Sequence, residues 1–398
     1  MKTKNTTIRF RVAEGWPRPG ANTDLRGQAV QTLVANHTLI VGQSRSGKTT
    51  AARRLIEEIL TWTGTEVVIL DPNADFKLLN QLPSDRSDKE FLKRWRGIRS
   101  NIEVAAPDRG TWGISWGKLS LEEMAAFLRL TPQENFAEYR HLDRHYKYDK
   151  DRGALGTLQT FVESPYFKVA VGEELERYRL LLNELAKLPV WAAPEAKKDV
   201  DLLLNAGHRG VVVDLSIDNE EVRTITVART LEVLWRRGEE RRKAFLKNGT
   251  PWVGTLVVID EAHLFAPPST DDPQKGAVCK RIERFADQGK KLNLYLMVIT
   301  QQPSKLHKGV LSECNNRIIL RMNERLSLKV LEETYGGMEG RYDGALTFNF
   351  REALLEGALL CDEVPPPAMP RGAKFFPART KEGGGTPKSD DWARPKPI

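Results

Sequence analysis

Two short apolar runs in the first part of the chain enclose a segment with helical periodicity. The runs are HTLIV at residues 37–41 and EVVIL at residues 66–70, and each has the length and composition of a buried strand. Between them, apolar residues recur from Lys48 to Trp62 at the spacing of one helix face, and Gly64 supplies a stop signal. The order of strand, helix and strand predicts a βαβ unit, which implies a parallel sheet.

Five further segments have the pattern of strands. A long helix follows the second of them, and its apolar side includes Val222, Leu231 and Trp235. The pattern as a whole predicts an α/β fold with a largely parallel central sheet. The strand segments are TTIRFRVA (6–13), RGVVVDLS (209–216), LVVID (256–260), LYLMVIT (294–300) and NRIILR (316–321).

The pattern between residues 117 and 205 is helical. Ser120-Leu-Glu-Glu123 and Thr131-Pro-Gln-Glu134 both have the form of a capping box, the second with proline at the first helical position. Residues 174–188 form another helical segment. We therefore expect a compact helical subdomain that is inserted into the sheet domain and contributes no strand to it.

The chain then divides into a core in two parts, an insertion and two flanking segments. After about residue 364 the sequence becomes rich in proline and glycine, which favours disorder or a loosely docked arm. The predicted boundaries are 1–35 for an N-terminal strand or arm, 36–116 and 206–364 for the core, 117–205 for the insertion and 365–398 for the tail.

Composition narrows the class of protein only slightly. No apolar run approaches the roughly 18 residues of a membrane span. The cysteines (Cys279, Cys314 and Cys361) are few and widely spaced, which favours a reducing cytoplasm and buried apolar roles. The formal charge of +8 favours polyanionic partners. His141 and His145 stand four residues apart, and with no third ligand nearby we interpret them as part of an ordinary charged helix face.

The candidate chemistry begins directly after the first apolar run, at GQSRSGKTT. Gly42 and Gly47 have the spacing of a loop whose backbone N–H groups turn toward phosphate oxygens. Lys48 can reach the β- and γ-phosphates, and the Thr49 hydroxyl can hold Mg²⁺. The preceding strand and the following helix supply the context that this motif requires. The predicted nucleotide-binding residues are Gly42, Ser44, Ser46, Gly47, Lys48, Thr49 and Thr50.

Three polar residues follow two later strands. LVVIDEAHLF places Asp260 at the carboxyl end of a buried parallel strand, where ligands bind in open α/β sheets. Asp260 is predicted to hold the Mg²⁺ of the nucleotide through its water shell. Glu261 is suited to polarise a water against the γ-phosphate, which a module that only binds nucleotide does not need. Gln301 ends the next strand at the same edge and can orient the γ-phosphate and the attacking water without titrating.

The stretches GQSRSGKT, ILDPNADF (69–76), VVIDEAHLF and VITQQPSKLHKGVLSECNNRIILR resemble the HerA group of the HerA/FtsK superfamily of hexameric DNA translocases. The resemblance extends over about residues 30–116 and 206–362. It implies a RecA-like P-loop NTPase core, ATP and Mg²⁺ as cofactors, and a cytoplasmic hexamer that moves double-stranded DNA with a separate nuclease or effector subunit. The DEAH letters do not indicate a DEAH-box helicase, since no second RecA-like lobe follows.

The trans-acting cation of such a ring stays open. The family's Gly-Arg-Lys before the glutamine strand is replaced here by Gly289-Lys290-Lys291. Lysine lacks the planar, multi-donor contact of arginine, so the candidates in a neighbouring subunit are Lys290, Arg284 and Arg317. Two other functions also remain open: a conjugation- or secretion-type ATPase of the same superfamily, and a nucleotide-gated scaffold that controls an effector. DNA-stimulated turnover would distinguish the motor from the scaffold.

Overall fold

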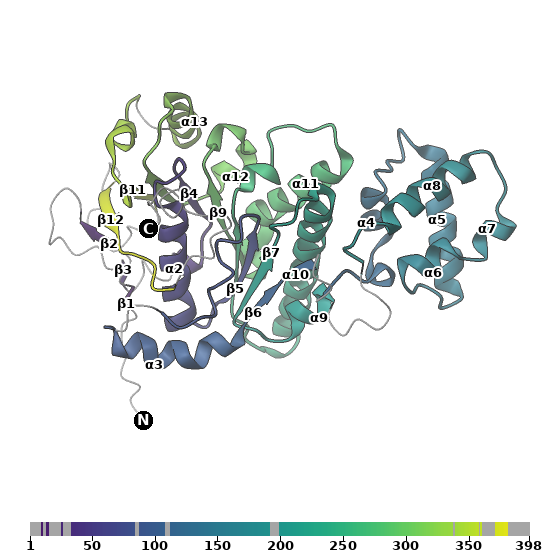
Figure 1. Cartoon of the computed structure of the whole chain (residues 1–398), viewed down its shortest axis with the longest axis horizontal. Coiled ribbons are helices and arrows are strands. Elements are labelled where there is room, and N and C mark those ends of the chain that lie inside the picture. Colours follow the sequence, from purple (N-terminus) through teal and green to yellow (C-terminus); the bar gives the residue numbers. More distant parts are fainter. Residues whose placement is uncertain are drawn as a thin grey trace, which may run out of the picture.

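The computed structural model has a ten-stranded sheet toward one end of the molecule and a cluster of helices at the other (Figure 1). No helix among the described residues is long and apolar enough to cross a membrane. The structure describes residues 9–10, 13–15, 25–26, 33–83, 87–107, 112–191, 199–336, 339–357, 359 and 371–380.

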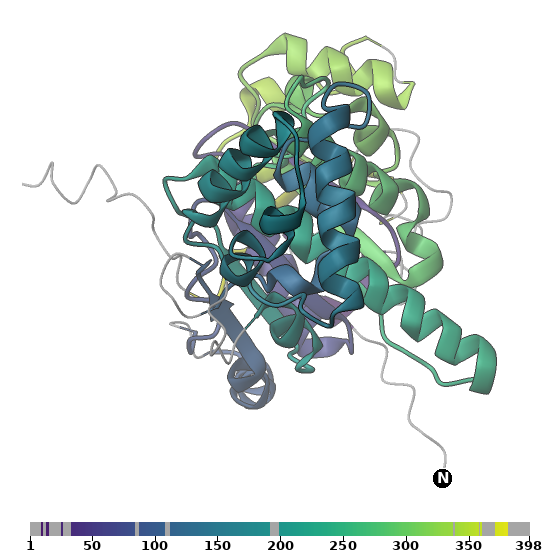
Figure 2. The same cartoon turned by 90° about the vertical axis from the view of Figure 1, so that its right-hand side faces the viewer.

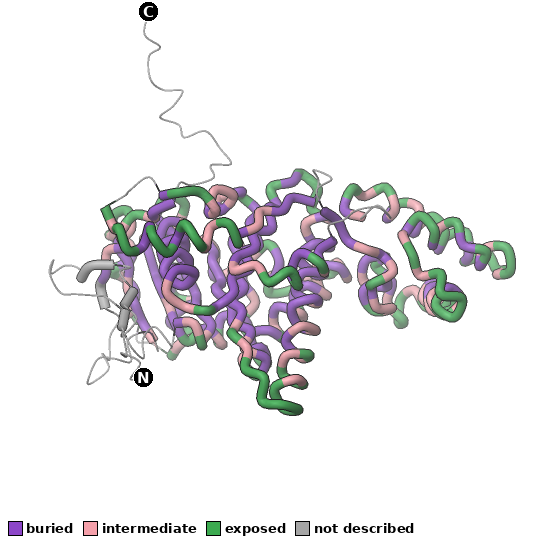
Figure 3. The backbone as a smooth tube through the Cα atoms, turned by 90° about the horizontal axis from the view of Figure 1, so that it is seen from below, coloured by how far each residue is buried: buried purple, intermediate pink, exposed green. Residues whose placement is uncertain are grey.

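Seven neighbouring strands of the sheet are parallel, in the order β10-β4-β9-β8-β5-β7-β6. Helices cover both faces of these strands, which explains why most of them are continuous apolar runs in the sequence (Figure 3). The prediction of a largely parallel α/β sheet is confirmed. The strands are β4 (Thr38–Val41), β5 (Glu66–Asp71), β6 (Ile102–Ala105), β7 (Gly210–Asp214), β8 (Thr255–Ile259), β9 (Leu294–Thr300) and β10 (Asn316–Leu320).

Three antiparallel strands extend the sheet beyond β10, and the sequence pattern did not predict this extension. They are β11 (Glu352–Gly357), β12 (Arg371–Phe375) and β2 (Ala13–Gly15), while β1 (Arg9–Phe10) pairs with β3 (Leu25–Arg26) elsewhere. β12 comes from the segment for which composition left disorder or a docked arm open. Cys361 and most of that segment lie outside the described residues.

Each face of the sheet is covered by its own helices, because successive side chains of a strand point to opposite faces. Ile40 and Ile69 pack with α2 and α3, whereas Leu39 and Leu70 belong to the core under α10 and α11. The helices are α2 (Lys48–Trp62), α3 (Lys89–Ile98), α10 (Glu220–Asn248), α11 (Pro273–Gln288), α12 (Lys308–Ser312) and α13 (Arg325–Tyr335), with 3₁₀ turns η1 (Arg99–Asn101), η3 (Trp116–Lys118), η4 (Ala262–Leu264), η5 (Gly289–Leu292), η6 (Pro303–Lys305) and η7 (Asp343–Thr347).

The residues described between η3 and β7 form helices and no strand of the ten-stranded sheet. Most of these helices lie beyond α10 and α11, away from the sheet (Figures 1 and 2). Their shared core combines leucines with a cluster of rings: the ring of His145 stacks on Phe161 and Tyr166, and its Nδ1 lies 2.9 Å from the hydroxyl of Tyr178. The helices are α4 (Leu121–Phe127), α5 (Phe136–Asp151), α6 (Leu158–Val162), α7 (Tyr166–Val169), α8 (Glu174–Ala186) and α9 (Val200–Asn205).

Two local predictions in this helical region were wrong. His141 and His145 do not lie on a charged surface, since their exposed fractions are 8% and 0% and both rings pack against aromatic side chains. Thr131 and Glu134 do not begin a helix. The N–H of Glu134 donates to the Thr131 hydroxyl at 3.2 Å, but this bond closes a turn, and the next helix is α5. The same hydrogen bond therefore serves a turn as well as a helix start.

The described segment after β12 is fixed to α2 by buried polar groups. The carboxylate of Glu57 accepts hydrogen bonds from the backbone N–H groups of Arg379 (2.8 Å) and Thr380 (2.7 Å). Arg53, which is fully buried, donates to the hydroxyl of Thr380 at 2.7 Å. This part of the tail is thus docked on the helix that follows the phosphate loop.

Candidate nucleotide site

The predicted phosphate loop connects β4 to α2 at the carboxyl edge of the sheet. Gly47 has φ 100°, which a side chain disfavours, and it directs the first N–H groups of α2 toward the loop. The ammonium of Lys48 is largely buried and donates to the carbonyl oxygen of Gln43 at 3.1 Å. Burial lowers the pKa of Lys48, while the charges of Glu261 and Asp260 raise it. Lys48 therefore lies between the loop and the acidic residues, as its predicted role requires.

Asp260 follows the last residue of β8, at the same edge of the sheet. Its carboxylate is 2% exposed and accepts a hydrogen bond from the Asn73 side chain at 3.4 Å. Burial, followed by the charges of Glu261 and Asp71, raises the pKa of Asp260 well above its ordinary value. A buried carboxyl in such surroundings is stabilised in its charged form by a cation, which is what a metal ligand needs.

Glu261 adopts a left-handed backbone conformation (φ 45°, ψ 47°), which is uncommon for a residue with a side chain. Its carboxylate accepts a hydrogen bond from the backbone N–H of Gln301, while Oε2 is buried without a hydrogen-bond partner and lies 3.4 Å from Nδ1 of His263. Burial raises the pKa of Glu261, and the charge of Lys48 opposes that shift. A strained acid with an unused oxygen is suited to accept a proton from a water.

Gln301 joins this group directly to the phosphate loop. Its strand β9 lies between β4 and β8, so the ends of all three strands are adjacent. The Ser44 hydroxyl donates to Oε1 of Gln301 at 2.9 Å. The loop, the acidic pair and the glutamine, which are far apart in the sequence, therefore meet at one place.

The turn after β5 adds two polar residues to which the sequence analysis gave no role. Asp71 accepts hydrogen bonds from the N–H groups of Asp75 (3.0 Å) and Phe76 (2.7 Å), and burial raises its pKa to about 7. The turn held in this way brings Asp75 to the hydroxyl of Thr49 at 3.3 Å and Asn73 to Asp260. In the sequence, ILDPNADF stands at the end of an apolar strand, and this position was the signal that could have pointed to these residues. The structure adds that this strand pairs with β8.

The oxygen donors gathered here fit Mg²⁺. The Thr49 hydroxyl and the carboxylates of Asp75 and Asp260 are hard ligands of the kind that this ion prefers. The neighbouring acids raise the pKa of Asp260 beyond the effect of burial, so a divalent cation would relieve their repulsion.

The three candidate trans-acting cations lie at the other edge of the sheet. Lys290 precedes β9, Arg317 is the second residue of β10, and Arg284 lies near the end of α11, which returns the chain to the amino end of β9. The phosphate loop follows the carboxyl end of β4, which is parallel to both strands. None of the three therefore reaches the phosphate loop of its own chain.

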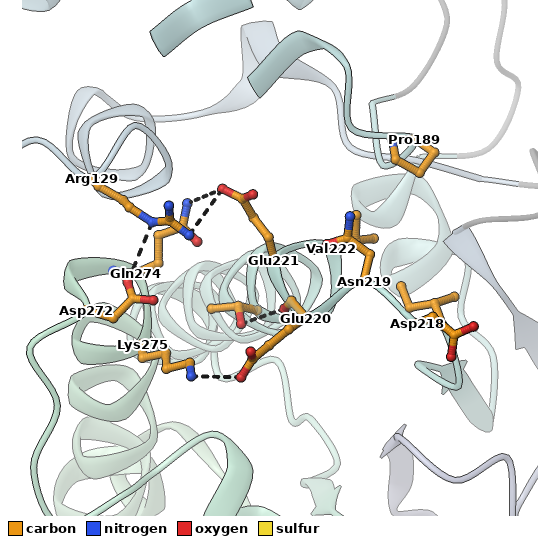
Figure 4. A pocket seen from close by; sticks show the side chains of 12 residues that line it. Arg129, Pro189, Asp218, Asn219, Glu220, Glu221, Val222, Asp272, Gln274 and Lys275 are labelled. Carbon is orange, nitrogen blue, oxygen red and sulfur yellow. Dashed lines mark hydrogen bonds and ion pairs between the residues drawn. The ribbon is translucent and has the colours of Figure 1, made fainter. Parts of the chain in front are cut away.

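A pocket of about 610 Å³ lies between the helical region and the amino ends of α10 and α11 (Figure 4). Five of its charged groups pair with one another: Arg129 lies 3.6 Å from Glu221 and 3.8 Å from Asp272, and Lys275 lies 2.7 Å from Glu220. This pocket is lined by none of the predicted nucleotide-binding residues. It is part of the joint between the helical region and the sheet domain.

Comparison with known sequences identifies a protein family and individual proteins to which this chain is similar. A family model described as the central domain of the helicase HerA matches residues 28–232, just over half of the chain. The DNA double-strand break repair helicase HerA of Pyrococcus furiosus is 24% identical over 91% of this chain and 69% of its own length. The protein of the same name from Sulfolobus acidocaldarius is 26% identical over 50% of this chain and 38% of its own length.

Two solved structures share the fold. VirB4 of Thermoanaerobacter pseudethanolicus superposes with a TM-score of 0.62 at 17% identity, covering 94% of this chain and 97% of that one. The plasmid coupling protein TrwB, in complex with a non-hydrolysable GTP analogue, gives a TM-score of 0.58 at 12% identity, with 88% of each chain covered. The predicted RecA-like P-loop core is confirmed by these likenesses.

Proposed function

The chain belongs to the HerA helicase family and is a P-loop ATPase, and we propose that it assembles as a ring and uses ATP to translocate duplex DNA. The observation that carries the proposal is the second carboxylate, Glu261, which adjoins Asp260 and lies near Lys48 with one oxygen unused. A protein that only bound nucleotide would have no need of a strained, partly desolvated acid at this place.

Each residue of the site has a role in this reaction. Thr49 and Asp260 would hold Mg²⁺, which would neutralise charge on the terminal phosphates of ATP. Lys48 binds those phosphates, and Gln301 orients the attacking water from the strand between the loop and the acids. Glu261 accepts the proton of that water through Oε2, which makes no hydrogen bond to the described residues.

A ring is proposed because the described cis site contains no arginine of the predicted finger set. ATPases of this class stabilise the transition state with a cation that is often supplied by a neighbour. Arg317 is already engaged, since its guanidinium donates to Glu356 at 2.9 Å and lies 4.2 Å from the ring centre of Tyr335. Arg284 is engaged in the same way, since its guanidinium lies 3.6 Å from Glu239 and its Cζ lies 3.8 Å from the ring centre of Trp235. This favours Lys290 as the trans-acting group. The family resemblance favours six subunits and a nuclease or effector partner.

The motor is tested by measuring steady-state ATP hydrolysis with and without long linear duplex DNA at low and moderate salt. We expect stimulation by DNA and none in the Lys48→Ala variant. DNA binding should be insensitive to sequence and should weaken steeply with salt, because each phosphate contact releases a counterion.

Translocation itself is measured by ATP-dependent displacement of a triplex-forming strand from the same duplex, and assembly by native mass measurement. A monomer under all conditions would contradict the ring. If DNA does not stimulate ATP hydrolysis and the triplex-forming strand is not displaced, the translocase hypothesis is wrong and the nucleotide-gated scaffold is favoured.

A further inference from the structure

A tight turn between η7 and β11 is attached to the phosphate loop. Phe350 and Arg351 are its two central residues, and Glu352 N–H donates to the Asn349 carbonyl at 3.2 Å to close it. The N–H of Arg351 donates to the carbonyl oxygen of Ser46 at 2.9 Å. The carbonyl oxygen of Arg351 accepts from a residue of β12 at 2.9 Å. The turn is therefore fixed to the nucleotide site on one side and to the sheet on the other.

The contact between this turn and the loop is close. A Cβ atom built on Gly47 would lie 3.0 Å from Cγ of Arg351 and 3.2 Å from its backbone nitrogen. The side chain of Arg351 therefore begins in van der Waals contact with the loop. Arg351 has φ 69°, a left-handed conformation that disfavours side chains, so the surrounding hydrogen bonds hold it in a strained position.

The guanidinium of Arg351 lacks an acidic partner among the described residues. Its Nε is buried and makes no hydrogen bond. Two other arginines of the chain differ in this respect: the buried Arg229 donates to two carboxylates, and Arg317 donates to one. A buried donor beside a phosphate loop is satisfied most simply by the anion that the loop binds.

Phe350 provides an exposed aromatic surface in the same turn. Its exposed fraction is 51%, and Cζ of Arg351 lies 5.5 Å from its ring centre. Such a pair alone is not diagnostic, because Phe136 in the helical region is 60% exposed with Arg140 at 5.4 Å. The pair of Phe350 and Arg351 differs from the pair of Phe136 and Arg140 because it lies beside the phosphate loop.

The order of the strands sets the end of the nucleotide that this pair faces. Gln301 and Glu261 follow β9 and β8 on one side of β4, whereas the turn precedes β11 on the other side. Gln301 and Glu261 act at the γ-phosphate, so the turn faces the opposite end, which carries the α-phosphate and the base.

We propose that Arg351 and Phe350 form the base-proximal half of the nucleotide site, in which Arg351 binds the α-phosphate and Phe350 packs against the base. This inference rests on the ATP site of the proposed function and adds the residues that hold its other end. Stacking tolerates any base because every base has a π-face. The site therefore accepts ATP and GTP with similar affinity.

The test compares MgATP with magnesium tripolyphosphate, which has no base, by calorimetric titration of the full chain in a Glu261→Gln background. Phe350→Ala is expected to weaken ATP binding about tenfold and to leave tripolyphosphate binding unchanged. Phe136→Ala is the matched control and should change neither. Equal weakening of both ligands by Phe350→Ala, or no change in either, would overturn the role of Phe350.

Arg351→Gly separates binding from folding. Glycine adopts the left-handed conformation freely, so the unliganded variant should unfold at the same temperature as the parent or higher. Loss of the guanidinium should nevertheless weaken both ATP and tripolyphosphate. Unchanged affinity for both ligands would refute the role of Arg351. If the binding results are as expected but DNA does not stimulate ATP hydrolysis, the proposed motor function is contradicted and the proposed base site is still supported.

Discussion

Strand β9 in the sheet and helix α5 in the helical region are both buried, but with opposite chemistry. All seven residues of β9 are buried, and six of them are apolar. The buried residues of α5 are Glu138, His141, Leu142, His145 and Asp149, of which only one is aliphatic. β9 is thus held by apolar packing, whereas α5 is held by aromatic rings and paired polar groups.

A fully buried guanidinium lies where the two regions meet. Arg229 of α10 donates to both oxygens of Glu123 at 2.8 and 2.9 Å and to both oxygens of Asp201 at 2.9 Å. Burial alone would lower the pKa of Arg229, but the two carboxylates raise it above its ordinary value. Glu123 belongs to α4 and Asp201 to α9, so this arginine ties two helices of the helical region to the sheet domain.

The largest effect is expected from the charges at the edge of the sheet. Glu261→Gln should reduce ATP turnover by about 10²–10⁴-fold because general-base catalysis is lost, while ATP binding remains. Lys48→Ala should instead abolish tight ATP binding, since the main countercharge to the terminal phosphates is gone. Single-turnover hydrolysis and calorimetric binding separate the two effects. Equal loss of ATP binding in both variants would contradict these distinct roles.

The next effect concerns the joint. Arg229→Met should destabilise the attachment of the helical region by about 3–5 kcal/mol, because it leaves the buried carboxylate of Glu123 without its partner and leaves Asp201 paired with Arg236 alone. Hydrogen exchange should accelerate in α4 and α9 and stay slow in β8. Arg236→Met is the control, since Arg236 pairs with the same Asp201 but is 43% exposed, and it should change stability by less than about 1 kcal/mol. If hydrogen exchange accelerated in β8 as much as in α4 and α9, the helical region and the sheet domain would unfold together.

The sequence predicted six of the seven parallel strands because these six are largely buried on both faces, whereas β6, two of whose four residues are only half-buried, was not predicted. Residues such as those of β9 form apolar runs that local pattern recognises without knowledge of tertiary contacts. The antiparallel strands β11 and β12 were missed because their pairing is set by long-range register. The buried face of α5 was also missed, since its histidines and acids have the pattern of a solvated surface.

Some residues of the candidate site could be predicted from the sequence and others could not. Lys48, Asp260 and Glu261 lie in motifs whose chemistry depends on local spacing. Phe350 and Arg351 lie in a turn with no motif, and only the pairing of β10 with β4 and β11 brings them to the loop.

Acid should affect α5 and the turn after β5 with opposite sign. Burial lowers the pKa of His145 to about 3, so its contribution to stability is present above the ordinary pKa of 6.5 and is lost as pH falls toward 3. At pH 5 the loss is about 2 kcal/mol. Burial raises the pKa of Asp71 to about 7, so its contribution is present at low pH and is lost as pH rises through 7.

Hydrogen exchange between pH 5 and pH 8, corrected for the intrinsic rate, should therefore show α5 loosening at the acidic end and the turn after β5 loosening at the basic end. His145→Gln should weaken the response of α5 and leave the turn after β5 unchanged. Part of the response of α5 should remain, because burial also lowers the pKa of His141 on the same helix. If acid loosened both regions equally, the assignment of these two groups would be wrong.

The smallest effect compares two stretches that have the same capping-box form. Ser120 makes the complete box at the start of α4, where its hydroxyl accepts from the N–H of Glu123 at 3.2 Å and its own N–H donates to the Glu123 carboxylate at 2.9 Å. Ser120→Ala should therefore cost about 1 kcal/mol. Thr131→Ala removes a similar bond from an exposed turn and should change stability by less than about 0.5 kcal/mol.

Urea unfolding of the two variants measures this difference. Glu123 also binds Arg229 of the joint, so the loss of the Ser120 cap should couple to Arg229→Met in a double-mutant cycle, whereas the loss of Thr131 should not. If Ser120→Ala and Thr131→Ala lowered the free energy of unfolding equally, and neither was coupled to Arg229→Met, the capping box at α4 would contribute no more stability than the hydrogen bond in the Thr131 turn.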